Sequence, residues 1–181
     1  ELSRLTEPVL IQGEPGTGKE LVVRAVHCQS QRRNGAFVKV NLAELNSDQL
    51  DGFVFGDRQK GFQKSTPAFG DLGNPADNGT LFLDEITALP PLLQSRLLNV
   101  YEKNSLSADT LKPARLNAAD MTPVVSSSRF LADLVRRGKF RKDLYFRMSA
   151  MSIDIPPLRQ RVSDIAPLTD FFADRLCREY G

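Results

Sequence analysis

A short glycine-rich stretch, GEPGTGK at residues 13–19, is the feature that most constrains how this chain can fold. It follows the apolar residues 8–11, which predict a buried strand, and precedes residues 20–27, whose apolar spacing predicts a helix. Glycines let the backbone turn tightly, so that successive N–H groups point into one concavity at the positive end of the helix. Lys19 adds a charge that can reach the terminal phosphates of a nucleotide. The pattern therefore predicts a phosphate-binding loop between a strand and a helix.

The residue after this lysine departs from the general pattern. It is Glu20, where phosphate loops commonly carry the Ser or Thr hydroxyl that helps to hold magnesium. A purely structural glycine turn would not need the lysine, so the phosphate-binding interpretation is preferred. The expected nucleotide-binding residues are Gly13, Glu14, Pro15, Gly16, Thr17, Gly18, Lys19 and Glu20.

A second nucleotide signal is the acidic pair that follows the apolar residues 79–83. At the end of a strand, Asp84 is positioned to hold magnesium directly or through water, and Glu85 to polarise a water against the terminal phosphate. The alternative is a solvated acidic turn. Together with the phosphate loop, the pair predicts ATP and Mg²⁺ as cofactors, with Asp84 as the metal residue.

A third cluster is basic and covers residues 139–147. Standing alone it would be the solvated face of a helix. Arginines can also stabilise the charge that spreads during phosphoryl transfer, and a neighbouring subunit can supply them.

Strand-like and helix-like segments alternate along the whole chain. This alternation predicts an α/β fold with a mostly parallel sheet and helices on both of its faces. Residues 53–78 and 105–121 lack periodicity and predict long irregular segments. The expected strands are 8–11, 36–41, 79–85, 123–128 and 151–155, and the expected helices are 20–27, 46–52, 89–103, 129–137, 142–148 and 163–180.

Composition bounds the remaining possibilities. The 181 residues suffice for one domain, and a net charge of +2 is too small to argue that this domain itself binds nucleic acid. No apolar run reaches the length of a membrane span and no signal-peptide pattern opens the chain, so we expect a cytoplasmic protein that does not contact membranes. Cys28 and Cys177 are expected to be reduced, and His27, the only histidine, to lie on a helix surface. Because the chain starts at Glu1, we expect it to be a piece of a longer protein.

Five stretches resemble, in order and spacing, the AAA+ central domain of bacterial enhancer-binding transcription regulators, which activate sigma-54 RNA polymerase. They are GEPGTGKE, GTLFLDEI, LLQSRLLNVYE, GKFRKDLYFRM and IPPLRQRVSDI, and the resemblance covers essentially the whole chain. It implies a three-layer α/β/α P-loop NTPase core over residues 1–162, with residues 163–181 beginning a helical lid that is otherwise largely absent. It also implies self-association as a dimer or a hexamer-type ring, contact with RNA polymerase, and DNA binding through a separate domain.

The same resemblance assigns roles to individual residues. Glu20 after the lysine is usual in this family. Asn41 matches the asparagine that contacts the catalytic glutamate, here Glu85, as a nucleotide-state switch. Arg141 and Arg147 match the arginines offered in trans across an oligomer interface, so the expected catalytic residues are Glu85, Asn41, Arg141 and Arg147.

Two departures from the family pattern stand out. Where the family carries GAFTGA, the loop that touches the sigma factor, residues 60–65 read KGFQKS. Losing both flanking glycines should restrict φ in a loop that must rearrange. Ser127 and Ser128 stand where the family usually has Thr-Asn to sense the γ-phosphate, so hydrolysis could be weakened while binding persists.

These departures favour an ATP-binding, self-associating domain that does not remodel sigma-54 and acts with the housekeeping polymerase. One alternative is a cyclic di-GMP sensor that controls biofilm or flagellar genes, in which an E-x-x-x-R element at Glu20, Leu21 and Arg24 helps to hold the dinucleotide. Another is a conventional sigma-54-activating ATPase with a variant loop. Whether ATP is hydrolysed stays open at this point.

Overall fold

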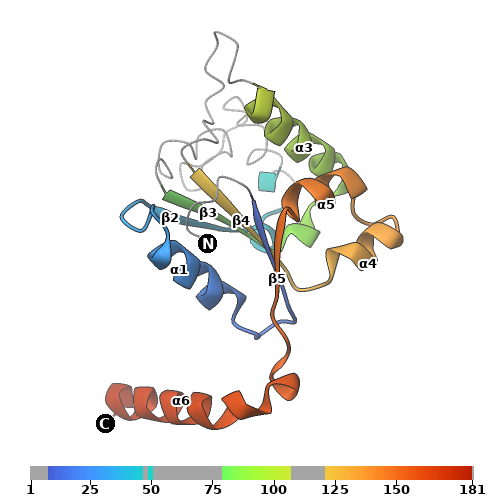
Figure 1. Cartoon of the computed structure of the whole chain (residues 1–181). Helices are drawn as coiled ribbons and strands as arrows, with labels where there is room; N and C mark the ends of the chain where they lie inside the picture. Colours follow the sequence, from blue (N-terminus) through green and yellow to red (C-terminus); the bar gives the residue numbers. More distant parts are fainter. Residues whose placement is uncertain (1–7, 47–48, 51–78, 107–120, 181) are drawn as a thin grey trace.

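A parallel five-stranded sheet forms the centre of the molecule, in the order β2-β3-β4-β1-β5 (Figure 1). The computed structural model describes residues 8–46, 49–50, 79–106 and 121–180. The strands are β1 Val9–Gln12, β2 Phe37–Asn41, β3 Gly79–Asp84, β4 Met121–Ser127 and β5 Met151–Asp154. The predicted α/β class with a mostly parallel sheet is confirmed.

Helices cover both faces of this sheet, which gives three layers (Figure 1). The helix α1 lies on one face, and α3, α4 and α5 lie on the other. The helices are α1 Lys19–Gln29, α3 Pro91–Leu106, α4 Leu131–Arg136, α5 Lys142–Met148 and α6 Ile165–Tyr180, with short 3₁₀ turns η2 Leu42–Glu44, η3 Ile86–Ala88, η6 Leu158–Gln160 and η7 Val162–Asp164. Apart from the helix expected at 46–52, most of which lies outside the described residues, the predicted strands and helices recur within a few residues of their expected bounds. Predictions for residues 51–78 and 107–120 lie outside the described residues.

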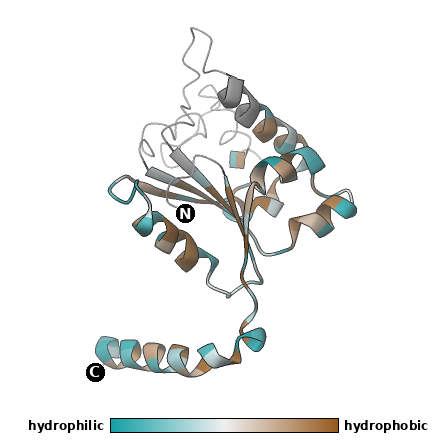
Figure 2. Cartoon of the chain, in the orientation of Figure 1, coloured by the Kyte–Doolittle hydropathy of each residue, from teal (hydrophilic) through white to brown (hydrophobic). Residues whose placement is uncertain are grey.

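The core is split by the sheet into two apolar layers. Side chains alternate along a strand, so Val9 and Ile11 of β1 pack toward α1, whereas Leu10 packs toward the larger layer with α3, α4 and α5. Central strands that are buried on both faces are mostly apolar, and Figure 2 shows much of their length coloured as hydrophobic. The larger layer holds Leu81, Leu83, Ile86, Leu93, Leu97, Val125, Leu131, Leu144 and Met148 among others.

The histidine prediction is wrong. His27 lies on the inner side of α1 and is 8% exposed. Its Nδ1 is 2.9 Å from Thr80 Oγ1 of β3, and its ring contacts the edge of Phe37. Removal from water lowers the pKa of His27, because burial disfavours the charged ring.

The last helix lies apart from the sheet (Figure 1). None of the residues of α6 is buried, and Phe171, Phe172 and Leu176 are all exposed. The division at residues 162 and 163 into a nucleotide-binding subdomain and the start of a lid stays a prediction. Among the described helices, none is both long enough and apolar enough to cross a bilayer.

Candidate functional site

A cavity of about 720 Å³ opens at the carboxyl ends of the central strands, where parallel α/β sheets generally bind ligands. One wall is the loop after β1, with Gly16, Gly18 and Lys19. The opposite wall contains Asp84 and Glu85, at the end of β3. Both predicted nucleotide signals therefore face one cavity. Its other lining residues include Pro15, Glu20, Asn41, Thr87, Ser128, Arg129 and Lys139.

The loop needs glycine for two different reasons. Gly18 precedes α1 with φ of 94°, a left-handed conformation that L side chains rarely adopt. At Gly13 the limit is space, because a Cβ would come within 2.8 Å of Thr17 Oγ1 and 2.9 Å of the Ile155 carbonyl oxygen. The loop is thereby held against the chain that follows β5.

The lysine of the loop is folded back onto its own backbone. Lys19 Nζ donates to the carbonyl oxygen of Gly13 at 2.8 Å and to that of Glu14 at 3.2 Å. Thr17 Oγ1 also donates to the carbonyl of Glu14, at 2.8 Å. The ammonium therefore rests at the rim of the cavity on carbonyl groups that an anionic ligand can replace.

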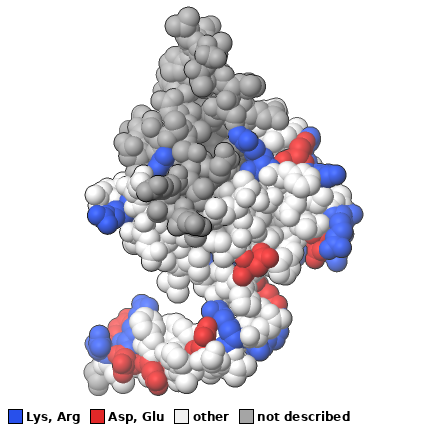
Figure 3. Space-filling model, viewed as in Figure 1, with Lys and Arg blue, Asp and Glu red and all other residues white. Residues whose placement is uncertain are grey.

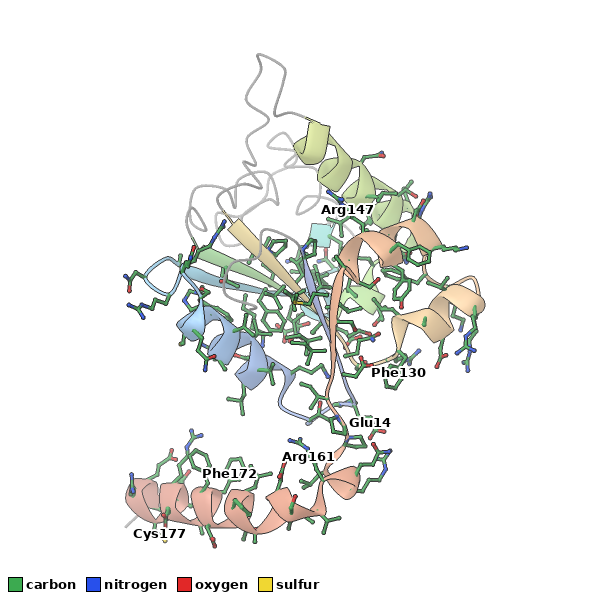
Figure 4. The ribbon with its side chains drawn as sticks, in the orientation of Figure 1. Glu14, Phe130, Arg147, Arg161, Phe172 and Cys177 are labelled. Carbon is green, nitrogen blue, oxygen red and sulfur yellow. The ribbon has the colours of Figure 1, made fainter. Side chains whose placement is uncertain are left out.

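Two arginines after β5 tie the loop to the segment that leads into α6. Arg159 forms a two-bond pair with the Glu14 carboxylate, at 2.6 and 2.8 Å, and Arg161 Nη2 donates to the Thr17 carbonyl at 2.8 Å. Figure 4 shows Glu14 and Arg161 close together where the chain leaves β5. The hydrogen bond to Arg159 lowers the pKa of Glu14 and raises that of Arg159. Sequence reasoning missed these contacts, since no local spacing pairs residues 145 positions apart.

The two strand-end carboxylates have different partners. Ser126 Oγ, on the neighbouring strand β4, donates to Asp84 Oδ1 and accepts the backbone N–H of Glu85 at 3.1 Å. Glu85 Oε2 accepts from the Ser128 N–H at 3.1 Å, and its Oε1 accepts from the Thr87 hydroxyl. Glu85 also has φ of 59°, an uncommon conformation for a residue with a side chain. Two hydrogen bonds thus hold its carboxylate at the cavity wall.

The serine pair at the end of β4 divides into an inner and an outer residue. Ser127 is fully buried, and its hydroxyl bonds to the backbone of Arg129 as both donor and acceptor. Ser128 lines the cavity. Of these two candidates for sensing a terminal phosphate, Ser128 is the one that faces the site.

A network of charges surrounds Glu20 at the start of α1. Arg24 donates to Glu20 Oε1 at 2.7 and 3.0 Å, and Lys39 Nζ donates to Glu20 Oε2 at 2.7 Å. Lys39 Nζ also lies 3.4 Å from Asp84 Oδ2. The hydrogen bond from Lys39, followed by that from Arg24, lowers the pKa of Glu20, while the bond to Glu20 raises the pKa of Lys39. Sequence reasoning selected Glu20 and Arg24 but missed Lys39, which no motif marks.

The switch asparagine lies in the cavity wall with other partners. Asn41 Nδ2 donates to Glu44 Oε1 at 2.7 Å, and its Oδ1 accepts the N–H of Ala43 at 3.1 Å. These bonds cap η2. In this conformation Asn41 and Glu85 share the cavity but are bonded to different groups, and the role of Asn41 as a switch stays a prediction.

The predicted trans arginines lie on α5 and at its start, away from the cavity. Arg141 bonds to Asp143, with the nitrogen Nη2 2.6 Å from Oδ2, and to Ser95 Oγ of α3 at 2.7 Å. The hydrogen bond from Arg141 lowers the pKa of Asp143. Arg147 lies on the same helix, and Figure 4 shows it near α3. In Figure 3, Lys and Arg side chains lie over the edge formed by α4 and α5, so positively charged groups are on the surface there.

The donor set suits magnesium only as a partner of phosphates. In the described part of the chain, no group of three or more His, Cys, Asp or Glu residues could hold a metal ion by itself. Mg²⁺ commonly takes one or two carboxylates and completes its shell with waters and substrate phosphates. Asp84 beside the phosphate loop provides that arrangement.

The chain matches a family model described as "Sigma-54 interaction domain" over residues 1–154. It is 44% identical to a Nif-specific regulatory protein of Rhodobacter capsulatus over 172 aligned residues. The aligned region covers 95% of this chain and 29% of that protein. It is 41% identical to the transcriptional regulatory protein ZraR of Klebsiella oxytoca, over 92% of this chain and 37% of that protein. The chain thus spans less than two fifths of the length of these relatives.

Solved structures show the same fold. Crystal structures of NtrX from Brucella abortus in complex with ADP and with ATP resemble this chain with TM-scores of 0.80 and 0.79. Each is 29% identical, and the match covers 99% of this chain and 40% of the other. The P-loop NTPase domain of an Escherichia coli sigma-54 activator is 20% identical with a TM-score of 0.56, which supports the fold alone.

Proposed function

We propose that this chain, which belongs to the sigma-54 interaction domain family, is the ATP-binding AAA+ domain of a bacterial transcription regulator. The observation that carries the proposal is the single cavity lined on one side by the phosphate loop and on the other by Asp84 and Glu85. The Brucella NtrX structures with ADP and ATP support it, because their fold is the same. As a partner of RNA polymerase and DNA, the whole regulator would work in the cytoplasm.

In this proposal each wall of the cavity has one task. Lys19 would leave the carbonyls of Gly13 and Glu14 and bind the terminal phosphates, where charge-assisted hydrogen bonds are stronger. Asp84 would hold Mg²⁺, which neutralises phosphate charge. Glu85 would accept a proton from an attacking water or orient it. Because Ser128, the serine that faces the cavity, lacks the amide of the asparagine usual in the family, we expect slow hydrolysis.

Calorimetric titration of ATP tests the binding site. Lys19→Ala should weaken ATP binding at least about a hundredfold, equivalent to about 2.7 kcal/mol. Its thermal midpoint without ligand should stay near wild type, since Lys19 bonds only to two loop carbonyls at the cavity rim and not to the apolar core. Arg33→Ala, an exposed residue in the turn after α1, removes the same charge as a control. Undiminished ATP binding by Lys19→Ala would contradict the assignment. The same titration with cyclic di-GMP decides whether the dinucleotide is a ligand at all.

Turnover separates binding from hydrolysis. Glu85→Gln should keep nucleotide affinity within about threefold of wild type, less than 0.7 kcal/mol, and abolish any measured hydrolysis. Unchanged turnover would show that Glu85 is not the catalytic carboxylate.

Self-association through the α4–α5 edge is the next element of the proposal. Arg141 and Arg147 would approach the nucleotide of a neighbouring subunit, in a dimer or a ring. Sedimentation with ATP should show assembly, and the double variant Arg141→Ala/Arg147→Ala should lose turnover while each subunit still binds ATP. Hydrolysis that persists in monomers of that variant would rule out the trans role.

The regulator is further proposed to act without engaging sigma-54, together with the housekeeping polymerase. The support is residue chemistry at positions 60–65, which lie outside the described residues. Lys60 and Lys64 would both have to lose water at a tight apolar contact, which costs several kcal/mol when a charge is unpaired. The rival is a conventional sigma-54 activator, which the family description favours. Capture of purified sigma-54 by the unmodified domain with ATP or a transition-state analogue would establish the rival. Capture only after GAFTGA is restored at 60–65 would support the proposal.

A further inference from the structure

A lysine outside every recognised motif lies between two acids of the nucleotide site. Lys39 is on β2, next to β3, and its Nζ contacts Glu20 Oε2 at 2.7 Å and Asp84 Oδ2 at 3.4 Å. Glu20 lies in the first turn of α1, directly after the phosphate loop, and Asp84 is the proposed magnesium residue at the end of β3. The ammonium therefore bridges the two walls of the cavity.

The surroundings fix this bridge in place. Parallel pairing sets Lys39 beside Phe82, and the Lys39 ammonium lies 5.9 Å from the centre of the Phe82 ring. The Lys39 side chain is 32% exposed, so water screens it only in part. Asp84 is held from its other oxygen by Ser126, and Glu20 by Arg24. Each acid thus keeps one oxygen for Lys39.

The negative charge in and around the cavity gives the contacts of Lys39 an electrostatic role. Glu20, Asp84 and Glu85 line the cavity together with Lys19, Arg129 and Lys139, and the phosphates of a nucleotide would add further negative charge. Opposed charges at a few Å stabilise each other, and like charges repel, by amounts that grow as water is excluded. Without Lys39, Asp84 would lose this cationic contact and would repel a metal-free nucleotide more strongly.

We propose that Lys39 is a built-in counter-ion of the nucleotide site, which offsets part of the negative charge of Glu20 and Asp84 while no divalent cation is bound and lets a nucleoside diphosphate bind without Mg²⁺. The inference rests on the proposed nucleotide binding and makes Lys39 a positioning residue that acts through the two acids. It has a second consequence, because Lys39 and a metal ion compete for Asp84 Oδ2. Removing the ammonium should weaken metal-free binding and strengthen the response to Mg²⁺.

The test measures ADP binding by calorimetry in EDTA and again in millimolar Mg²⁺. In EDTA, Lys39→Met should bind ADP at least about tenfold more weakly than wild type, and in Mg²⁺ within about threefold of it. The ratio of the two dissociation constants should therefore rise in the variant. Lys39→Arg should restore most of the metal-free affinity, because it keeps the charge. Arg33→Met, at an exposed turn after α1, makes the same change in net charge and should leave the ratio unaltered.

The outcomes separate this inference from the function on which it rests. If wild type fails to bind ADP under both conditions, the proposed nucleotide site itself is wrong. If wild type binds but Lys39→Met weakens binding equally with and without Mg²⁺, Lys39 has only a structural role and the inference is overturned. An Arg33→Met ratio that moves as far as that of Lys39→Met would also overturn it, since net charge alone would then explain the effect.

Discussion

The helices α1 and α6 both present apolar side chains at helical spacing, yet they occupy opposite environments. α1 packs on β1 and β3, buries Val23 and His27, and begins at the wall of the nucleotide cavity. α6 has no buried residue, although its apolar side chains are larger. Periodicity therefore predicts that a helix has an apolar face, but the surrounding fold decides whether that face contributes to stability.

A matched pair of proline substitutions gives the largest test of this contrast. Ala25 and Ala173 are both exposed residues in the interior of their helices. Proline there removes a backbone hydrogen bond and costs about 3 kcal/mol or more. Ala25→Pro should lower the free energy of unfolding by at least that amount and abolish ATP binding, because α1 carries the phosphate loop.

Ala173→Pro should reduce the helical circular dichroism signal but leave the urea midpoint of the sheet nearly unchanged. Urea unfolding followed by circular dichroism and by nucleotide binding checks both variants. Equal losses of stability would show that α6 and the sheet unfold as one unit, and the contrast would fail.

The fold could be predicted from the sequence because the patterns that indicate its strands and helices are local. The parallel sheet follows from alternating segments, and α5 begins at Lys142 and ends at Met148, as its pattern predicts. The hydrogen-bond partners of single residues were harder to predict. His27 was expected on the helix surface because the sequence offers it no nearby Cys or His partner, whereas its actual partner, Thr80, comes from a strand 53 residues later.

The same distinction between local and long-range signals applies to the candidate site. The phosphate loop and the strand-end acids are short motifs whose chemistry depends on residues next to one another, and the cavity brings them together as expected. The contacts that hold these motifs come from distant elements. Arg159 reaches Glu14, Ser126 reaches Asp84, and Lys39 reaches both Glu20 and Asp84. Only the sheet order and the course of the chain after β5 bring such partners together.

A pair of truncations tests the contrast at a smaller scale. Val23 on α1 is fully buried, whereas Leu176 on α6 is exposed. Val23→Ala should cost about 2 kcal/mol, from lost apolar burial and a residual cavity. Leu176→Ala removes more carbon atoms but should change the free energy of unfolding by less than about 0.5 kcal/mol, because alanine also favours helix. Urea denaturation measures both, and a larger loss for Leu176→Ala would mean that the face of α6 is covered in solution.

The smallest effect is a pH dependence that belongs to α1 alone, because the only histidine of the chain lies there. Burial lowers the folded-state pKa of His27 below its ordinary value of 6.5. The unfolded chain then binds the proton more readily than the folded chain once the pH falls below that value. The histidine contribution to stability is therefore fully present above about pH 6.5 and is lost as the pH falls toward the folded-state pKa.

His27→Gln isolates this contribution, because the amide can still bond to the Thr80 hydroxyl but does not titrate. Between pH 7.5 and 5, wild type should lose more stability than the variant, because only wild type carries a titrating group at this position whose folded-state pKa is lowered. The carboxylates titrate in both proteins, so the difference between the two urea series reports the histidine. NMR titration of the His27 ring gives the folded-state pKa independently. Identical pH slopes, or a ring that titrates at or above 6.5, would show that α1 is not held against β3 in solution, and the contrast between the two helices would lose its basis.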